Sequence, residues 1–219
     1  MDWEYFLELF LGGITRGSIY ALIALGYTMV YGIIELINFA HGEIYMIGAF
    51  TALIIATVLT MAGFNQVAIV VIASGAAVLY SCAYGFTIEK LAYKPLRNAP
   101  RLSALISAIG MSLFLQNYVL LAQTSDFLPF PSLIPDFEFW EPYAHIISSQ
   151  ELVIIITTAI VMILLTFLIK FSKIGKAMRA TAQDMNMAML LGVDVNLVIS
   201  ATFIIGSATA AIGGVLIAS

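Results

Sequence analysis

The chain has 219 residues, of which 62% are hydrophobic and 10% are charged. An ordinary soluble domain carries about 25% charged residues, so this composition excludes a water-soluble globular protein. So much apolar surface is stable only in a bilayer, and we predict a polytopic membrane protein. The formal net charge of −4 is interpreted as two populations of charged residues on opposite sides of a membrane.

Six apolar runs are long enough to cross a membrane as helices. A membrane helix needs about 20 apolar residues, whereas a transmembrane strand alternates apolar and polar residues over about ten. These runs are continuously apolar, so we predict an all-α, polytopic transmembrane helical bundle that forms a single domain over residues 1–219. The predicted spans are 9–33, 44–62, 67–89, 102–123, 151–170 and 197–219.

Small residues recur at every fourth position in the first, third and sixth spans. Such a stripe lets another helix approach closely, either within the chain or in a second subunit. The stripes are Gly13, Gly17 and Ala21; Ala73, Ala77, Ser81 and Gly85; and Gly206, Ala210, Gly214 and Ala218.

The basic residues predict the orientation of the spans. All lysines and arginines except Arg16 fall in the connections after the third and fifth spans, whereas the N-terminal tail and the connection 123–150 carry acidic residues. The basic connections are therefore predicted to be cytoplasmic and the N-terminus to lie outside. Arg16 is interpreted as an arginine that snorkels to the outer interface or as part of a transport path. The residues of the two basic connections are Lys90, Lys94, Arg97, Arg101, Lys170, Lys173, Lys176 and Arg179.

A polar segment separates the first two spans. It holds Glu35, Asn38, His41 and Glu43 within nine residues and contains no lysine or arginine. One interpretation is a short cytoplasmic turn in which Asn38 caps the next helix. The other, which we favour, is a broken or re-entrant segment at membrane depth whose four polar side chains line a translocation path or gate.

The basic connection after the fifth span leads into a predicted amphipathic helix. Residues 177–191 place Met178, Ala182, Met185 and Met189 at helical spacing, and a glycine follows that is expected to end the helix. The basic residues crowd at its start, which is not typical of a helix that lies in the lipid interface. Because methionine suits a surface that repacks against a partner, we predict a cytoplasmic helix that docks on another protein.

Several segments resemble one family. The sequence GKAMRATAQDMNMAMLLGV at 175–193 resembles the coupling segment of inner-membrane permeases of ATP-binding cassette importers. The long stretch GSIYALIALGYTMVYGIIELINFAHGEIYMIGA at 17–49 resembles the signature of the branched-chain amino-acid uptake permeases. PFPSLIPD at 129–136 and TFIIGSATAAIGGVL at 202–216 are similar to that family as well.

The resemblance implies an inner-membrane permease subunit that imports branched-chain amino acids, or a related small polar solute, by alternating access. It implies a second permease subunit, a solute-binding protein outside, and separate ATPase subunits that bind ATP and dock on the coupling segment. Gln183 and Asn186 depart from the acidic and basic residues expected in that segment. The coupling residues implied by the motif are Gly175, Arg179, Ala182, Asp184, Ala188 and Gly192.

The connection 124–147 combines prolines, aromatic residues and carboxylates. One interpretation is an aromatic belt at the membrane surface. In the other, the connection is part of the platform on which the solute-binding protein releases its cargo, and its acidic residues pair with basic residues of that protein.

No enzyme motif accompanies these features. The phosphate-binding pattern G-x-x-x-x-G-K-[ST] is absent, so we predict no catalytic residue and no cofactor in this chain, with ATP bound by a partner subunit. His41-Gly42-Glu43 lacks the cysteine pair of a zinc deaminase, so no metal site is predicted, and no nucleic acid partner is expected.

Two other functions remain open. An ion-coupled carrier or channel would use Glu35, Glu43 and Arg16 as intramembrane charges, and an inert subunit would only pack within a larger complex. Permeases of the resembled family usually continue for several more helices, whereas this sequence stops within an apolar run at Ser219. We therefore expect a chain truncated at its C-terminus.

Overall fold

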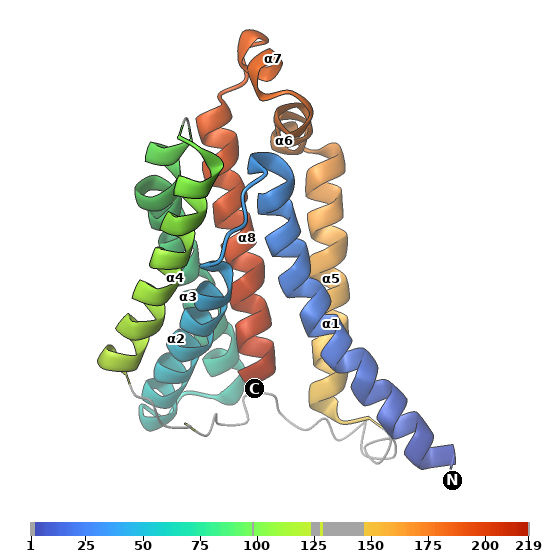
Figure 1. Ribbon diagram of the computed structural model, residues 1–219. Coiled ribbons are helices and arrows are strands. Elements are labelled where there is room, and N and C mark those ends of the chain that lie inside the picture. The colour runs from blue at the N-terminus through green and yellow to red at the C-terminus, as the bar shows by residue number, and fades with distance from the viewer. Residues whose placement is uncertain (1–2, 98, 124–127, 129–146, 219) are drawn as a thin grey trace.

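The computed structural model describes residues 3–97, 99–123, 128 and 147–218. Within these residues, six helices are long and apolar enough to cross a membrane. The predicted all-α bundle with six spans is confirmed, and the chain is a multi-pass membrane protein. The membrane helices are α1 (Trp3–Ile34), α2 (His41–Met61), α3 (Gln66–Ile88), α4 (Arg101–Ala122), α5 (Ser149–Phe171) and α8 (Val195–Ala218) (Figure 1).

The two ends of the bundle differ in charge. One end, at the top of Figure 1, holds the short helices α6 (Lys173–Gln183) and α7 (Met185–Leu190) and the connection from α3 to α4. That connection begins with a π-helical turn, η1 (Glu89–Tyr93), and a short 3₁₀ turn, η2 (Lys94–Leu96). Both predicted basic connections therefore share one end, which we call the basic end. The N-terminus lies at the opposite end.

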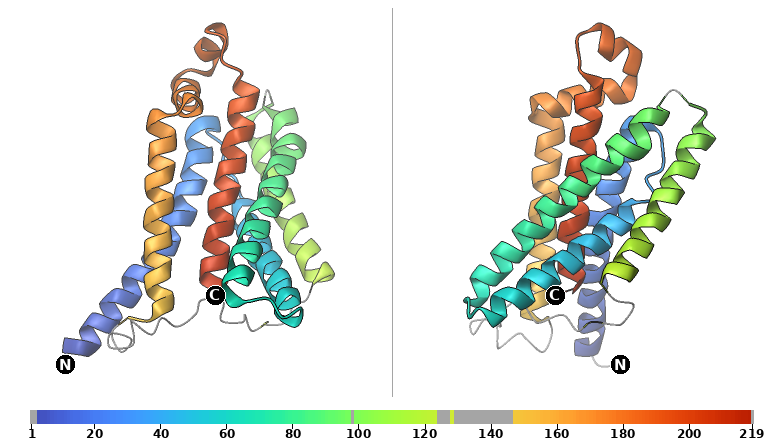
Figure 2. Two further views of the ribbon diagram at one scale, coloured as in Figure 1. Left: turned by 180° about the vertical axis from the view of Figure 1, so that it is seen from behind. Right: turned by 90° about the vertical axis from the view of Figure 1, so that its left-hand side faces the viewer.

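Helix α8 lies at the centre of the bundle and contacts α1, α2 and α3 (Figure 2). Lipid provides no hydrophobic force between helices, so close contact between backbones must hold them together. Glycines make that contact possible, because a Cβ at Gly26 of α1 would overlap Thr209 of α8, and a Cβ at Gly85 of α3 would overlap Ser207 of α8. The sequence therefore places glycine where these helices cross α8.

The predicted small-residue stripes have different surroundings. A Cβ added at Gly13 or Gly17 of α1 would meet no described atom within 4 Å, so these two glycines contact no other helix of the described residues closely. The stripes of α3 and α8, in contrast, lie inside the bundle, as the interpretation of internal packing predicts. Their buried members are Ala73, Ala77, Ser81, Gly85, Gly206, Ala210 and Gly214.

Helix α2 begins inside the bundle. After α1 ends at Ile34, residues 35–40 turn back toward the centre, and α2 starts below the level of the basic end (Figure 1). Asn38 does not cap α2, because the N-cap residue is Ala40 and has no side-chain hydrogen bond. The break dips toward the centre of the bundle, as the favoured interpretation predicts, and the prediction that Asn38 caps α2 is wrong.

The coupling segment forms two helices where the sequence predicts one over 177–191. Asp184 adopts an extended backbone, with φ −155° and ψ 107°, and its side chain accepts a hydrogen bond from the backbone N–H of Met187. Asp184 therefore ends α6 and caps α7. Apolar periodicity missed this break because the apolar spacing continues across Asp184. Gly192 follows α7 with φ +84°, which is the left-handed conformation that favours glycine after a helix.

The close contact between α2 and α8 predicts opposite effects at two glycines. A Cβ at Gly214 of α8 would overlap the carbonyl oxygen of Tyr45 in α2, whereas Gly75 of α3 faces open space. Gly214→Ala is expected to destabilise the protein by about 1–3 kcal/mol. Gly75→Ala is expected to be neutral, or to stabilise by up to about 1 kcal/mol through helix propensity. Thermal unfolding in detergent measures both, and equal melting temperatures for the two variants would contradict this packing.

Candidate functional site

The re-entrant segment 35–40 is anchored at both of its ends. The buried hydroxyl of Tyr93, in η1, donates hydrogen bonds to Asn38 Oδ1 at 3.1 Å and to the Ile37 carbonyl at 3.2 Å. Glu35 has φ +52°, and its carboxylate accepts a hydrogen bond from Arg101 at 2.8 Å. A non-glycine residue in this conformation costs about 1–3 kcal/mol and persists only where its surroundings fix it. The segment is thus held in one conformation by α3 and α4.

His41, the first residue of α2, lies between α1 and α8. Its side chain is buried, and its ring meets the ring of Tyr27 edge-on at 5.9 Å. A Cβ at Gly26 would lie 3.1 Å from His41 Cε1, so the glycine makes room for the imidazole. His41 Nε2 has no hydrogen-bond partner among the described residues. A buried imidazole nitrogen without a partner is costly, which is more typical of a functional group than of a packing residue.

Glu43 carries a carboxylate into the bundle. It lies in the first turn of α2, is half-buried, and accepts a hydrogen bond from Ser112 of α4 at 2.9 Å. No lysine, arginine or histidine of the described residues forms an ion pair with Glu43. A membrane helix that holds a carboxylate without a cation is by default a functional site.

The predicted path residues are therefore not all together. The structure brings Asn38, His41 and Glu43 to the start of α2, inside the bundle. Glu35 lies apart from them, because its ion pair with Arg101 is largely exposed.

Two residues of the predicted coupling motif fasten α6 to α5. A Cβ at Gly175 would overlap the carbonyl oxygens of Leu168 and Ile169, so only glycine permits this approach. The guanidinium of Arg179 donates hydrogen bonds to the carbonyls of Ile169 and Lys170. These carbonyls lie in the last turn of α5 and lack partners within the helix. Gly175 and Arg179 thus set the direction in which α6 leaves the membrane helix.

Three of the other four motif residues shape α7. Asp184 and Gly192 bound it, and Ala188 is buried, with its carbonyl accepting a hydrogen bond from Val193 N at 3.0 Å. Ala182 is exposed on α6.

The predicted docking face included Met189 but missed the exposed leucine pair at the end of α7. Leu190 and Leu191 are 81% and 76% exposed, beyond the ends of the membrane helices (Figure 1). We call the exposed apolar side chains at this tip the α7 surface. The available signal was the leucine pair directly before Gly192, where a helix end leaves side chains uncovered. The α7 surface consists of Met187, Met189, Leu190 and Leu191.

Arg16 lies in α1 near the opposite end of the bundle. It lines a cavity of about 310 Å³ with Glu8, Glu151, Gly12 and Gly13. Arg16 forms no ion pair within the described residues. Its surroundings are compatible with both predicted roles, because they lie near the N-terminal end of the bundle and contain carboxylates.

Two further predictions concern the connection 124–147 and metal binding. Most of the aromatic and acidic connection 124–147 lies outside the described residues. No group of three or more histidine, cysteine, aspartate or glutamate residues able to hold a metal ion occurs in the described part of the chain.

Comparison with known proteins identifies the family. The family described as "Branched-chain amino acid transport system / permease component" matches residues 9–219. This chain belongs to that family. The permease is 50% identical over 220 residues to the high-affinity branched-chain amino acid transport system permease protein LivH of Escherichia coli K12, covering 97% of this chain and 70% of LivH. It is 48% identical over 217 residues to the corresponding protein BraD of Pseudomonas aeruginosa, covering 97% of this chain and 71% of BraD.

LivH of Salmonella typhimurium is similar to the same extent, at 48% identity over 219 residues, 97% of this chain and 70% of the relative. No solved structure matches the permease. Membership of a family of transport permeases fits the predicted permease subunit and does not fit the ion-coupled carrier or channel.

The contact of Gly175 with α5 predicts that a side chain there displaces α6. Gly175→Val is expected to push α6 from the last turn of α5 and to expose the bonds after Lys170 and Lys173 to trypsin. Ala182→Val, at an exposed position of the same helix, is the matched control. Limited digestion of membranes that contain each variant should cleave Gly175→Val faster than the wild type and Ala182→Val at the wild-type rate. Equal rates for both variants would show that α6 does not depend on this contact.

Proposed function

We propose that the permease is the membrane subunit of an ATP-binding cassette importer that moves branched-chain amino acids, or a related small polar solute, by alternating access. Family membership and the names of the relatives support this assignment. The observation that carries it is the α7 surface, an exposed apolar tip at the basic end. Apolar side chains gathered beyond the membrane helices are typical of a surface that another protein covers.

The position of the α7 surface supports docking of ATPase subunits. Both basic connections lie at the same end as α7, which the positive-inside rule assigns to the cytoplasm, where ATP is available. The N-terminus then lies outside the inner membrane. The ATPase subunits bind ATP and supply the work, so the permease itself requires no nucleotide site. A second permease subunit and an external solute-binding protein complete the proposed importer.

The start of α2 supports a place on the translocation path. Asn38, His41 and Glu43 lie at the break before and at the start of α2, and transporters build solute sites at broken helices of this kind. Glu43 is the group best suited to the ammonium of an amino acid, because no cation of the described residues neutralises it. The exposed pair joins Glu35, directly after α1, to Arg101, the first residue of α4, and suits a gate on the basic side.

Docking predicts a sharp effect of charge on α7. Leu190→Asp is expected to weaken binding of the ATPase subunit by about tenfold or more, as the loss of a central apolar contact does, and to abolish ATP-dependent uptake. Asn186→Asp adds the same charge at an exposed, polar position of α7 and serves as the control. Co-purification of the ATPase with each variant measures binding, and thermal unfolding confirms that both are folded. Retention of the ATPase by Leu190→Asp would exclude α7 as the docking surface.

The proposed path predicts a loss of transport without a loss of assembly. Glu43→Gln removes the charge but preserves the hydrogen bond with Ser112. It is expected to lower uptake about tenfold or more, because the solute ammonium loses its charged hydrogen-bond partner. Glu35→Gln makes the same change at the proposed gate and is expected to lower uptake less, because Arg101 already neutralises the Glu35 carboxylate. Uptake into vesicles with saturating solute-loaded binding protein distinguishes them. Normal uptake by Glu43→Gln would remove Glu43 from the path.

A further inference from the structure

A buried acidic residue lies at the end of α3, where sequence reasoning assigned no role. Glu89 is the first residue of the π-helical turn η1 and is completely buried. A fully buried carboxylate is rare unless it is paired, and π-helical turns frequently mark functional sites. Tyr93, the last residue of the same turn, is also buried and holds the re-entrant segment.

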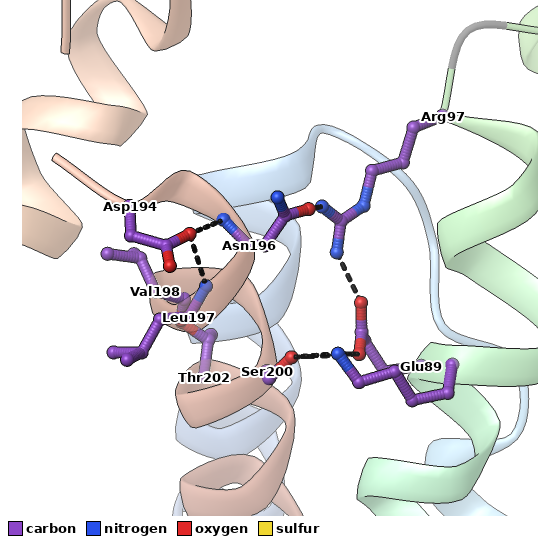
Figure 3. A network of polar contacts seen from close by, with 9 residues as sticks. Glu89, Arg97, Asp194, Asn196, Leu197, Val198, Ser200 and Thr202 are labelled. Atoms are coloured by element: carbon purple, nitrogen blue, oxygen red, sulfur yellow. Dashed lines mark hydrogen bonds and ion pairs between the residues drawn. The ribbon is translucent and has the colours of Figure 1, made fainter. Parts of the chain in front are cut away.

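The Glu89 carboxylate joins three parts of the chain (Figure 3). Its Oε2 accepts a hydrogen bond from Ser200 Oγ of α8 at 2.9 Å and pairs with Lys90 Nζ at 3.4 Å. Its Oε1 accepts a hydrogen bond from Arg97, which follows η2. Arg97 also donates to Asn196 Oδ1 of α8 at 2.6 Å. We call Glu89, Arg97, Asn196 and Ser200 the latch.

The latch lies next to the coupling segment along the chain. Only residues 191–194 separate α7 from α8. Asp194 Oδ1 accepts hydrogen bonds from the backbone N–H groups of Asn196 at 3.0 Å and Leu197 at 3.1 Å. These bonds hold Asp194, in the short connection after α7, to the first turn of α8. Through this connection, a displacement of α7 would move Asn196.

The other side of η1 leads to the re-entrant segment. The Tyr93 hydroxyl donates to Asn38 Oδ1 at 3.1 Å, and its ring lies 5.1 Å from the ring of Phe203 in α8. Contacts are therefore continuous from α7 through the first turn of α8, the latch and η1 to residues 37 and 38.

The pairing within the latch is incomplete. Arg97 Nε is buried and has no hydrogen-bond partner among the described residues, while Glu89 is bonded through another nitrogen of the same guanidinium. A guanidinium can present two N–H groups to one carboxylate. Coupling between sites requires an element with two arrangements, and a second pairing of Arg97 with Glu89 through Nε is the one that the latch would offer.

We propose that the latch transmits movement of α7 to the re-entrant segment 35–40, and that Glu89, Arg97, Asn196 and Tyr93 are positioning residues that contact no solute. Transmission of work from an ATPase rests on the proposed function. The mechanical link between Asn196 and residues 35–40 does not rest on the proposed function. The link is therefore tested separately, on the permease alone.

Hydrogen exchange tests the link in the permease alone. Asn196→Ala removes one exposed side chain of the latch and leaves Glu89 paired with Lys90 and Ser200. Backbone amides of residues 35–40 are expected to exchange faster in this variant, although Asn196 is distant from them in the sequence. Thr87→Ala is the control, because Thr87 is exposed on α3 and bonds only its own helix, at the Ala83 carbonyl. Unchanged exchange in Asn196→Ala would overturn the latch whatever the protein transports.

The assembled importer tests transmission. In proteoliposomes with ATPase subunits and binding protein, Asn196→Ala and Tyr93→Phe are each expected to raise the ATP hydrolysed per solute transported about fivefold or more, a usual coupling between linked sites. If Asn196 and Tyr93 act through the same chain of contacts, the double variant hydrolyses no more ATP per solute than the more severe single variant. Multiplied effects, or unchanged ratios, would overturn transmission through the latch. Absence of ATP-dependent uptake in the wild type would instead refute the proposed function and leave the exchange result to decide the link.

Discussion

The close approach of α8 to its neighbours is the constraint on which the rest of the structure depends. In a bilayer, helices gain nothing by hiding apolar side chains from lipid, so contact between backbones decides which helices associate. Gly26, Gly85 and Gly214 provide that contact with α1, α3 and α2. A larger residue at any of them would separate α8 from α1, from α3, which leads into Glu89, or from α2, which carries His41 and Tyr45. Packing and function are therefore not independent here, because the polar groups meet only while α8 is seated.

The second constraint is the absence of water around buried backbone. Residues 35–40 leave helical structure inside the bundle, where unpaired polar groups are expensive. The Tyr93 hydroxyl pairs with the backbone carbonyl of Ile37 and with the Asn38 side chain, and Arg101 pairs with the exposed side chain of Glu35. Both partners come from the region between α3 and α4. A segment that depends on a neighbouring connection for its hydrogen bonds must follow that connection when it moves.

Local patterns in the sequence predicted much of this structure. Apolar length gave the six spans, and the polar segment without basic residues indicated the re-entrant break. Gly192 marked the end of α7 because its backbone conformation favours glycine. The break at Asp184 was missed, because a capping aspartate and a polar surface aspartate look alike when apolar spacing continues past them. The partners of Glu89 could not be predicted, since Ser200 lies 111 residues away and only the packing of α3 on α8 brings them together.

These contacts divide the coupling segment between two parts of the bundle. Gly175 and Arg179 fasten α6 to the end of α5, whereas Asp194 joins the residues after α7 to the first turn of α8. Between the two helices the chain has one extended residue, Asp184. A force on α7 therefore reaches α8 more directly than α5, because α6 is restrained by backbone contacts and Asp184 is the point where the backbone can turn. Under the proposed function, ATPase closure would shift α8, with the helices seated on it, relative to α5. The re-entrant segment joins α2 to α1, and α1 contacts both α8 and α5, so such a shift would act on the segment through α1.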